Sequence, residues 1–128
     1  METSQVSYMH EHVEERDRLM LRWYLELIST WRNIAEIVAR VAKRLYPSCK
    51  VYVFGGAAEG RLTALSDLDI LIVLPYEPSP RERLEVKRRI VLEAFEEGVP
   101  WDYPLDLHVT GPQGFKNYKR YARKLIEL

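Results

Sequence analysis

Cysteine is nearly absent from the chain, and so are amide side chains and net charge. A single cysteine, Cys49, excludes an internal disulfide framework and a zinc site built from cysteines, and it fits a reducing, cytoplasmic setting. Nineteen basic and nineteen acidic residues cancel, which argues against an extended nucleic-acid-binding surface. No apolar run approaches the roughly 20 residues that span a bilayer, so we expect neither a membrane segment nor a signal peptide. The scarcity of asparagine and glutamine is typical of a thermophile.

The chain does have enough apolar sequence for one compact domain, residues 1–128. It contains 128 residues, of which 47% are hydrophobic. Acidic residues concentrate between 51 and 110, whereas residues 111–128 are mainly basic. This pattern fits a carboxylate-rich site whose counter-charge comes from elsewhere, and it equally fits unevenly charged solvated faces.

A long amphipathic helix is predicted over residues 13–46. Apolar residues recur at alternating steps of three and four from Tyr24 to Leu45, without glycine or proline, and Pro47 ends the pattern. The residues before it are polar and unpatterned, so we expect a frayed terminus. The alternative is a break near Ser29-Thr30 that folds two helices onto one core.

An unbroken helix of this kind would be about 45 Å long at 1.5 Å per residue, longer than the domain is wide. Its overhanging end carries Met20, Leu21, Trp23 and Tyr24. Because such an exposed apolar patch usually marks an interface, we expect a homodimer or a complex with a helical partner. Trp23 and Trp31 lie about two turns apart and are expected to anchor that surface.

Residues 50–128 are expected to form a core of alternating strands and helices. The strands are β-branched or continuously apolar, and Ser79-Pro80-Arg81-Glu82 has the pattern of a capping box that starts a helix. The expected elements are strands at 50–54, 67–74 and 105–110, and helices at 79–97 and about 115–125.

Three aspartates are the candidate metal ligands. Asp67 and Asp69 are two residues apart at the start of a strand, so alternation points both carboxylates to one face. Two such charges repel each other, and a hard cation such as Mg²⁺ offsets the repulsion. Asp106 begins the third strand, and three carboxylates on adjacent strands suit two divalent ions in phosphoryl chemistry. Asp102 is a rival for the third position, although it precedes Pro104 and belongs to a loop.

A glycine-rich turn leaves the first strand just before these acids. Residues 55–60 read Gly-Gly-Ala-Ala-Glu-Gly, and small residues let backbone N–H groups approach phosphate oxygens. The pattern matches neither a Walker loop nor a dinucleotide fingerprint. Ser66 is placed to cap the turn or to hydrogen-bond an aspartate.

The combined pattern resembles the signature of the polymerase-β-like nucleotidyltransferases, and more narrowly of their minimal prokaryotic group. The residues that carry the resemblance are Gly55-Gly56, Gly60 and Ser66-Asp67-Leu68-Asp69-Ile70. The resemblance covers residues 50–128 and implies an α+β fold, a small mixed sheet flanked by helices. It implies that Asp67, Asp69 and Asp106 are catalytic and bind two Mg²⁺ ions, with Mn²⁺ as an alternative. The implied reaction moves a nucleotidyl group from ATP or another nucleoside triphosphate to a hydroxyl acceptor.

The resemblance also implies that Gly55, Gly56, Arg61 and Ser66 contact the nucleotide. Gly56 replaces a serine of the family signature, and Glu59 stands where the family often has a basic residue. Arg61 is placed to supply the missing cation. These departures predict intact metal binding but a weak triphosphate site. His108 lies two residues after Asp106 and is expected on the same strand face. One interpretation is that it contacts phosphate or the acceptor, and the other is that it is an ordinary surface residue.

Members of the minimal group are typically paired with a helical partner protein. The resemblance therefore implies an antitoxin that adenylylates, transferring AMP, or simply blocks, a ribonuclease toxin. The alternative is a binding module with a degenerate site that acts by complexing a helical partner. An antibiotic nucleotidyltransferase is disfavoured because such enzymes usually carry a second domain, and the chain is too short for a template-directed polymerase.

Overall fold

The fold is taken from a computed structural model, which describes residues 2–63 and 66–128. Described side chains begin at Glu14, and those of Tyr24, Leu27 and Ile28 are outside the described set. The part of the predicted apolar stripe that rests on Tyr24 and Leu27 therefore lies outside the described residues.

A four-stranded mixed sheet forms the centre of the molecule. Its strands are β1 (Lys50–Phe54), β2 (Leu68–Val73), β3 (Leu105–Thr110) and β4 (Ile126–Glu127), in the spatial order β3-β2-β1-β4. β1 is antiparallel to β2 and β4, whereas β2 and β3 are parallel. The strands predicted at 50–54 and 105–110 are confirmed, and β2 is one residue shorter at each end than expected.

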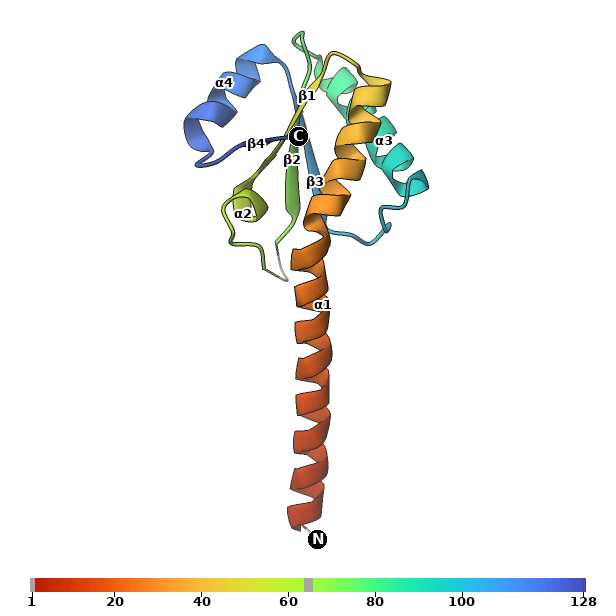
Figure 1. Ribbon diagram of the computed structural model, residues 1–128, viewed down its shortest axis with the longest axis vertical. Helices are drawn as coiled ribbons and strands as arrows, with labels where there is room; N and C mark the ends of the chain where they lie inside the picture. The colour runs from red at the N-terminus through yellow and green to blue at the C-terminus, as the bar shows by residue number, and fades with distance from the viewer. Residues whose placement is uncertain (1, 64–65) are drawn as a thin grey trace.

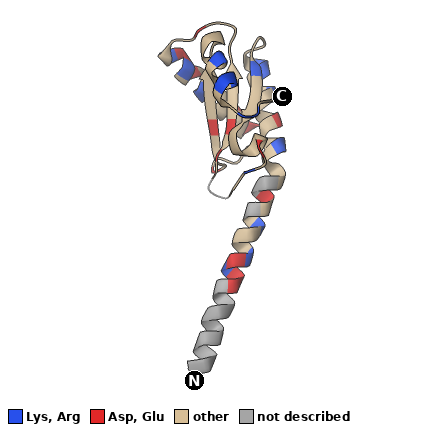
Figure 2. Ribbon diagram, turned by 90° about the vertical axis from the view of Figure 1, so that its left-hand side faces the viewer, with Lys and Arg blue, Asp and Glu red and all other residues tan. Residues whose placement is uncertain are grey.

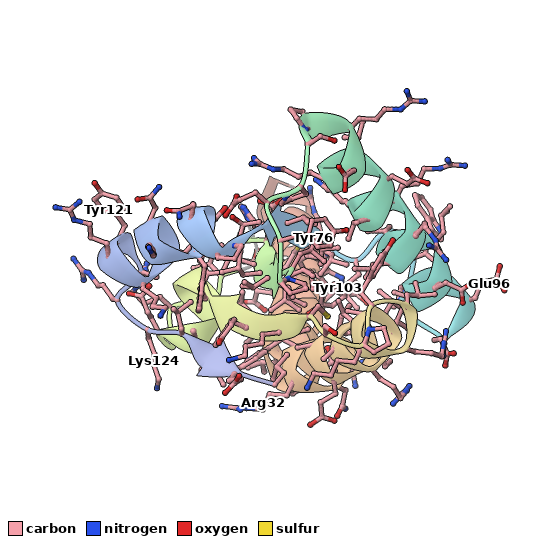
Figure 3. The ribbon with its side chains drawn as sticks, turned by 90° about the horizontal axis from the view of Figure 1, so that it is seen from above. Arg32, Tyr76, Glu96, Tyr103, Tyr121 and Lys124 are labelled. Atoms are coloured by element: carbon pink, nitrogen blue, oxygen red, sulfur yellow. The ribbon has the colours of Figure 1, made fainter. Side chains whose placement is uncertain are left out.

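Helices cover both faces of this sheet, so the expected α+β architecture is confirmed. They are α1 (Glu2–Leu45), α2 (Gly55–Ala58), α3 (Pro80–Glu96) and α4 (Pro112–Tyr121). α1 and α3 lie on one face and bury the main core against the sheet, while α4 lies on the other (Figures 1 and 3). The α4 face therefore stays open enough to hold polar groups.

Helix α1 is a single unbroken helix that projects far beyond the sheet (Figure 1). It begins at Glu2 rather than near residue 13, so the expected frayed terminus is wrong. No break occurs at Ser29-Thr30, where the helix is continuous. Both hydroxyls donate to the backbone carbonyl of Glu26, at 3.0 and 2.6 Å, so these polar side chains are accommodated on the helix surface. Within the described part of the chain, no helix is both long and apolar enough to cross a membrane.

The two tryptophans of α1 have different environments. Trp31 is 7% exposed and belongs to the core, so its expected role as an interface anchor is wrong. Trp23 is 47% exposed, and the large apolar residues near it are exposed as well. These are Leu19, Met20, Leu21 and Leu25. The projecting half of α1 thus presents apolar surface together with acidic and basic side chains (Figure 2).

The ends of the other helices show where local sequence signals suffice. Ser79 caps α3 by accepting from the backbone N–H of Glu82, and the Glu82 carboxylate accepts in return from the N–H of Ser79, as the capping box predicts. The last helix ends at Tyr121, so placing Ala122 and Leu125 on it was wrong. The chain instead extends into β4, which pairs with the outer edge of β1.

Candidate metal and nucleotide site

The parallel pairing of β2 and β3 brings two of the three predicted acids together. Asp69 is the register partner of Asp106, and Leu71 is the partner of His108. Strand alternation turns Ile70 and Leu107 into the core with α1 and α3, so Asp69, Asp106 and His108 share the α4 face. Figure 2 shows acidic residues at the same level on neighbouring strands.

The three side chains form a tight cluster. Nε2 of His108 lies 3.1 Å from Asp106 Oδ2 and 3.4 Å from Asp69 Oδ1. Each residue offers one atom that could ligate a metal ion, and these three atoms lie within 4.8 Å of one another. The hydroxyl of Tyr118, from α4, lies 3.3 Å from Nδ1 of the same imidazole. Two carboxylates and an imidazole nitrogen are a donor set suited to a divalent ion.

Asp67 lies beside this cluster rather than inside it. It precedes β2, and its side chain is exposed. Among the described residues, the group of closely spaced metal-ligand atoms contains Asp69, Asp106 and His108 but not Asp67. Its charge still acts on Asp69, whose pKa it helps to raise. Asp102 is exposed in the turn before β3, where it lines a separate cavity with Trp23. The structure thus favours Asp106 over Asp102 as the third acid.

The charge on Asp69 is unfavourable in this setting. Burial raises the pKa of its carboxyl, and the nearby charges of Asp106 and Asp67 add to that rise, while His108 opposes it through a hydrogen bond and its charge. A bound cation would relieve the same repulsion.

The backbone of Gly55 makes room for the Asp69 carboxylate. Gly55 has a φ of +69°, in the left-handed region, and a Cβ there would lie 2.5 Å from Asp69 Oδ2. Sequence reasoning assigned this glycine to phosphate approach, and the structure adds a steric reason for it. The close backbone, the two carboxylates and the imidazole together fit a divalent ion.

A cleft of about 720 Å³ opens next to the cluster. Its lining includes Gly55, which lies against the Asp69 carboxylate, and Tyr118, whose hydroxyl contacts His108. The lining residues are Phe54, Gly55, Glu59, Arg61, Asn117, Tyr118, Tyr121, Ala122 and Arg123. Two arginines and several aromatic rings therefore line the cleft beside the acidic cluster. A phosphate-bearing ligand with an aromatic base would find partners of suitable chemistry there.

The predicted nucleotide contacts are only partly brought to this cleft. Gly55 and Arg61 line it, but Gly56 and Ser66 are not among its lining residues. The Ser66 hydroxyl is held by Thr63, 3.1 Å from its backbone N and 2.9 Å from its hydroxyl, so Ser66 closes the turn. The Arg61 guanidinium forms an ion pair with Glu59, with 3.1 Å between Nη2 and Oε1. The cation that the sequence assigned to phosphate is therefore already paired with a carboxylate.

Sequence reasoning missed the contribution of the C-terminal segment. Asn117, Tyr121 and Arg123 line the cleft from α4 and the stretch that follows it. Figure 3 shows Tyr121 at the outer end of α4. The available signal was the basic composition of residues 111–128, which suggested a counter-charge for the acidic middle without naming its residue.

Comparisons with known proteins bear on the family and the fold of the chain. A family model described as a nucleotidyltransferase domain matches residues 34–127. A crystal structure from Sulfolobus solfataricus, provisionally named a nucleotidyltransferase, is 19% identical, with a TM-score of 0.54 over 79% of this chain and 84% of that one. At that identity it supports the fold alone. No curated protein matches the chain.

Two other solved structures resemble the chain less closely in three dimensions. One, also provisionally named a nucleotidyltransferase, is 27% identical with a TM-score of 0.43 over 70% of this chain and 90% of that one. The other is a toxin-antitoxin crystallised with AMP-PNP, 18% identical with a TM-score of 0.43 over 59% of this chain and 56% of that one.

Proposed function

The chain belongs to the nucleotidyltransferase domain family, and from that premise we propose that it transfers a nucleotidyl group from a nucleoside triphosphate to a hydroxyl acceptor. The acceptor oxygen would form a bond to the α-phosphorus and release its proton to solvent, the bond from that phosphorus to the bridging oxygen would break, and pyrophosphate would leave. The observation that carries the proposal is the pairing of Asp69 with Asp106 beside the open cleft.

We propose that Asp69 and Asp106, with Asp67 next to them, hold divalent metal, Mg²⁺ or Mn²⁺. When bound, such an ion neutralises phosphate charge and polarises the reacting phosphoryl group. The two carboxylates would hold the ion at the mouth of the cleft, and Gly55 keeps the backbone close without displacing Asp69. With Asp67 as a further ligand, the three carboxylates would hold two ions.

The cleft supports a specific placement of the nucleotide. Arg123 offers a guanidinium to the phosphates, while Tyr118 and Tyr121 offer rings against which a base such as adenine can pack. Glu59 weakens this site, because its carboxylate pairs with Arg61 and repels phosphate. We therefore expect ATP to bind weakly to the free protein.

The second candidate is a binding module whose degenerate site no longer transfers nucleotides. The Arg61–Glu59 pair and the missing hydroxyl at Gly56 favour it. In this reading, α1 and the basic C-terminal segment act at a partner interface.

A partner is proposed for either candidate, because the projecting half of α1 exposes Trp23 among other apolar side chains. We propose that this surface pairs with a second copy of the chain, and a helical protein such as a toxin partner is the other outcome of the test. Sedimentation of the pure protein above the 15.1 kDa monomer mass, lost in Trp23→Ala, would support self-association. A monomer at high concentration would contradict it.

Transfer of radioactivity from α-labelled ATP, with Mg²⁺ or Mn²⁺ and with candidate acceptors, tests the enzymatic proposal. Asp106→Asn should abolish transfer, whereas Asp102→Asn, an exposed carboxylate in the turn before β3, should leave it unchanged. Equal activity of wild type and Asp106→Asn would overturn the proposed site. Ion binding without transfer to any acceptor would favour the binding module.

A further inference from the structure

His108 belongs to the acidic cluster, yet the carboxylate chemistry proposed above gives it no role. It lies two residues after Asp106 on β3, so its ring projects from the same face. Its Nε2 faces both Asp106 Oδ2 and Asp69 Oδ1, at 3.1 and 3.4 Å. The imidazole is 29% exposed, comparable with the 26% of Asp69, so it lies within the site rather than at its edge.

These separations suit a hydrogen bond without metal, and they also suit atoms that share one ion. Two ligand atoms each about 2.1 Å from a metal are about 3.0 Å apart at a right angle and about 3.4 Å apart at the tetrahedral angle. The distances from His108 Nε2 to the two carboxylate oxygens fall in this range. Small shifts would therefore allow all three atoms to ligate the same cation.

The other ring nitrogen has the partner that a ligating imidazole needs. Nδ1 of His108 lies 3.3 Å from the Tyr118 hydroxyl, which accepts from it when Nδ1 carries the proton. Phe54 packs edge-on against the imidazole, with ring centroids 4.9 Å apart, and restricts its rotation. The hydroxyl can accept from Nδ1 or donate to it, so both tautomers keep this contact. The tautomer protonated at Nδ1 directs the Nε2 lone pair at the carboxylates, where an ion would bind.

We propose that Nε2 of His108 is a third ligand of the divalent ion held by Asp69 and Asp106, and that it gives the site a preference for Mn²⁺ or another first-row transition ion over Mg²⁺. This inference rests on the proposed function, since it presupposes an ion between the two carboxylates. Mg²⁺ binds oxygen ligands almost exclusively, whereas transition ions gain from imidazole nitrogen. Tyr118 is then a positioning residue that acts through His108.

The test uses the full chain, stripped of metal with a chelator, and needs no acceptor substrate. Mn²⁺ binding is measured by the loss of the free-ion signal in electron paramagnetic resonance, and Mg²⁺ binding by competition. In the wild type, the electron spin echo of bound Mn²⁺ should carry the modulation of a coordinated ¹⁴N nucleus. In His108→Gln, which offers an oxygen in place of the nitrogen, that modulation should vanish.

The substitutions should change the affinity for Mn²⁺ more than the affinity for Mg²⁺. We expect His108→Gln to weaken Mn²⁺ binding about 10–100-fold, the scale of losing a ligand or its support, while Mg²⁺ binding changes far less. Tyr118→Phe should weaken Mn²⁺ binding by about 10-fold and keep the ¹⁴N modulation. Tyr52→Phe is the matched control, because its hydroxyl lies on the same sheet face but contacts Glu127 instead of His108.

The outcomes distinguish this inference from the function on which it rests. Wild-type protein that binds Mn²⁺ without ¹⁴N modulation would overturn the role of His108 and leave the carboxylate site intact. Failure to bind either ion would overturn the proposed metal site as well. Circular dichroism checks that each variant is folded, and the wild-type spectrum decides the question even if His108→Gln does not fold.

Discussion

Gly55→Ala is expected to remove metal binding while barely changing stability relative to a matched control. An added methyl group at this position would lie 2.5 Å from Asp69 Oδ2 and 3.3 Å from its Cγ. Because carbon and oxygen rarely approach closer than about 3.4 Å without strong repulsion, the carboxylate must retreat by about 1 Å. A displacement of that size is enough to disrupt a site that needs its ligands held within about 0.5 Å.

Gly60→Ala is the matched control, because it introduces the same backbone strain as Gly55→Ala without the clash with Asp69. Gly60 has a φ of +71°, nearly the same as Gly55, but a Cβ there meets nothing within 4 Å. Both variants should lose about 1–2 kcal/mol because alanine disfavours the left-handed region. For a domain of this size, that loss lowers the melting temperature by several degrees. The added clash at Gly55 falls on the end of a side chain that can rotate, so it should add little.

The two variants should differ in their response to metal. Without nucleotide, Mn²⁺ at about 100 times its dissociation constant stabilises a folded protein by about 2.7 kcal/mol. Differential scanning calorimetry should show that rise in melting temperature for wild type and Gly60→Ala, but not for Gly55→Ala. An equal rise in both variants would refute the argument that Gly55 makes room for a metal-binding Asp69.

Two further predictions concern the nucleotide and the pH dependence of stability. Gly56→Ser combined with Glu59→Arg should tighten ATP binding by about 1–3 kcal/mol, or roughly 5–150-fold by calorimetry, and the serine Cβ fits because its nearest neighbour is 3.5 Å away. No gain, with tight binding already present in the wild type, would contradict it. The pKa of Glu97 is lowered, first by its hydrogen bond to Arg44 and then by the charge of that guanidinium. Its contribution to stability should therefore be present above the unfolded pKa, near 4.3, and disappear as the pH falls through the lower folded value. Urea unfolding should show Glu97→Gln less stable than wild type at pH 7 and equally stable near pH 2, whereas a constant difference would exclude this cause.

Much of the fold follows from signals that lie close together in the sequence. Ser79 and Glu82 are three residues apart and determine the start of α3, so a local pattern was sufficient to predict it. β3 was predictable in the same way from an apolar alternation bounded by Pro104 and Gly111. The pairing of Asp69 with Asp106 needed more, because the order of strands is not local, and the family resemblance supplied it.

Two of the wrong predictions, the end of the last helix and the role of Trp31, concern contacts that no local pattern encodes. β4 has two residues, and its strand conformation depends on the free edge of β1, where Val53 pairs with Ile126. The chain turns extended at Ala122, directly after α4, and Arg123 in this extended stretch lines the cleft. The burial of Trp31 could not be predicted either, because the apolar stripe of α1 does not show which of its residues lie over the sheet.

The position of Asp69 argues that the site was selected for chemistry rather than stability. Leu71, the next residue of β2 on the same face, is fully buried, and most of the strand is apolar on both sides. A strand shaped by packing alone would carry an aliphatic side chain at position 69, because a carboxylate there is desolvated and faces Asp106 across the sheet. Places where a sequence breaks its own local pattern are where function is expected. A cation beside Asp69 would turn this unfavourable charge into binding energy, and His108 partly offsets the charge by itself.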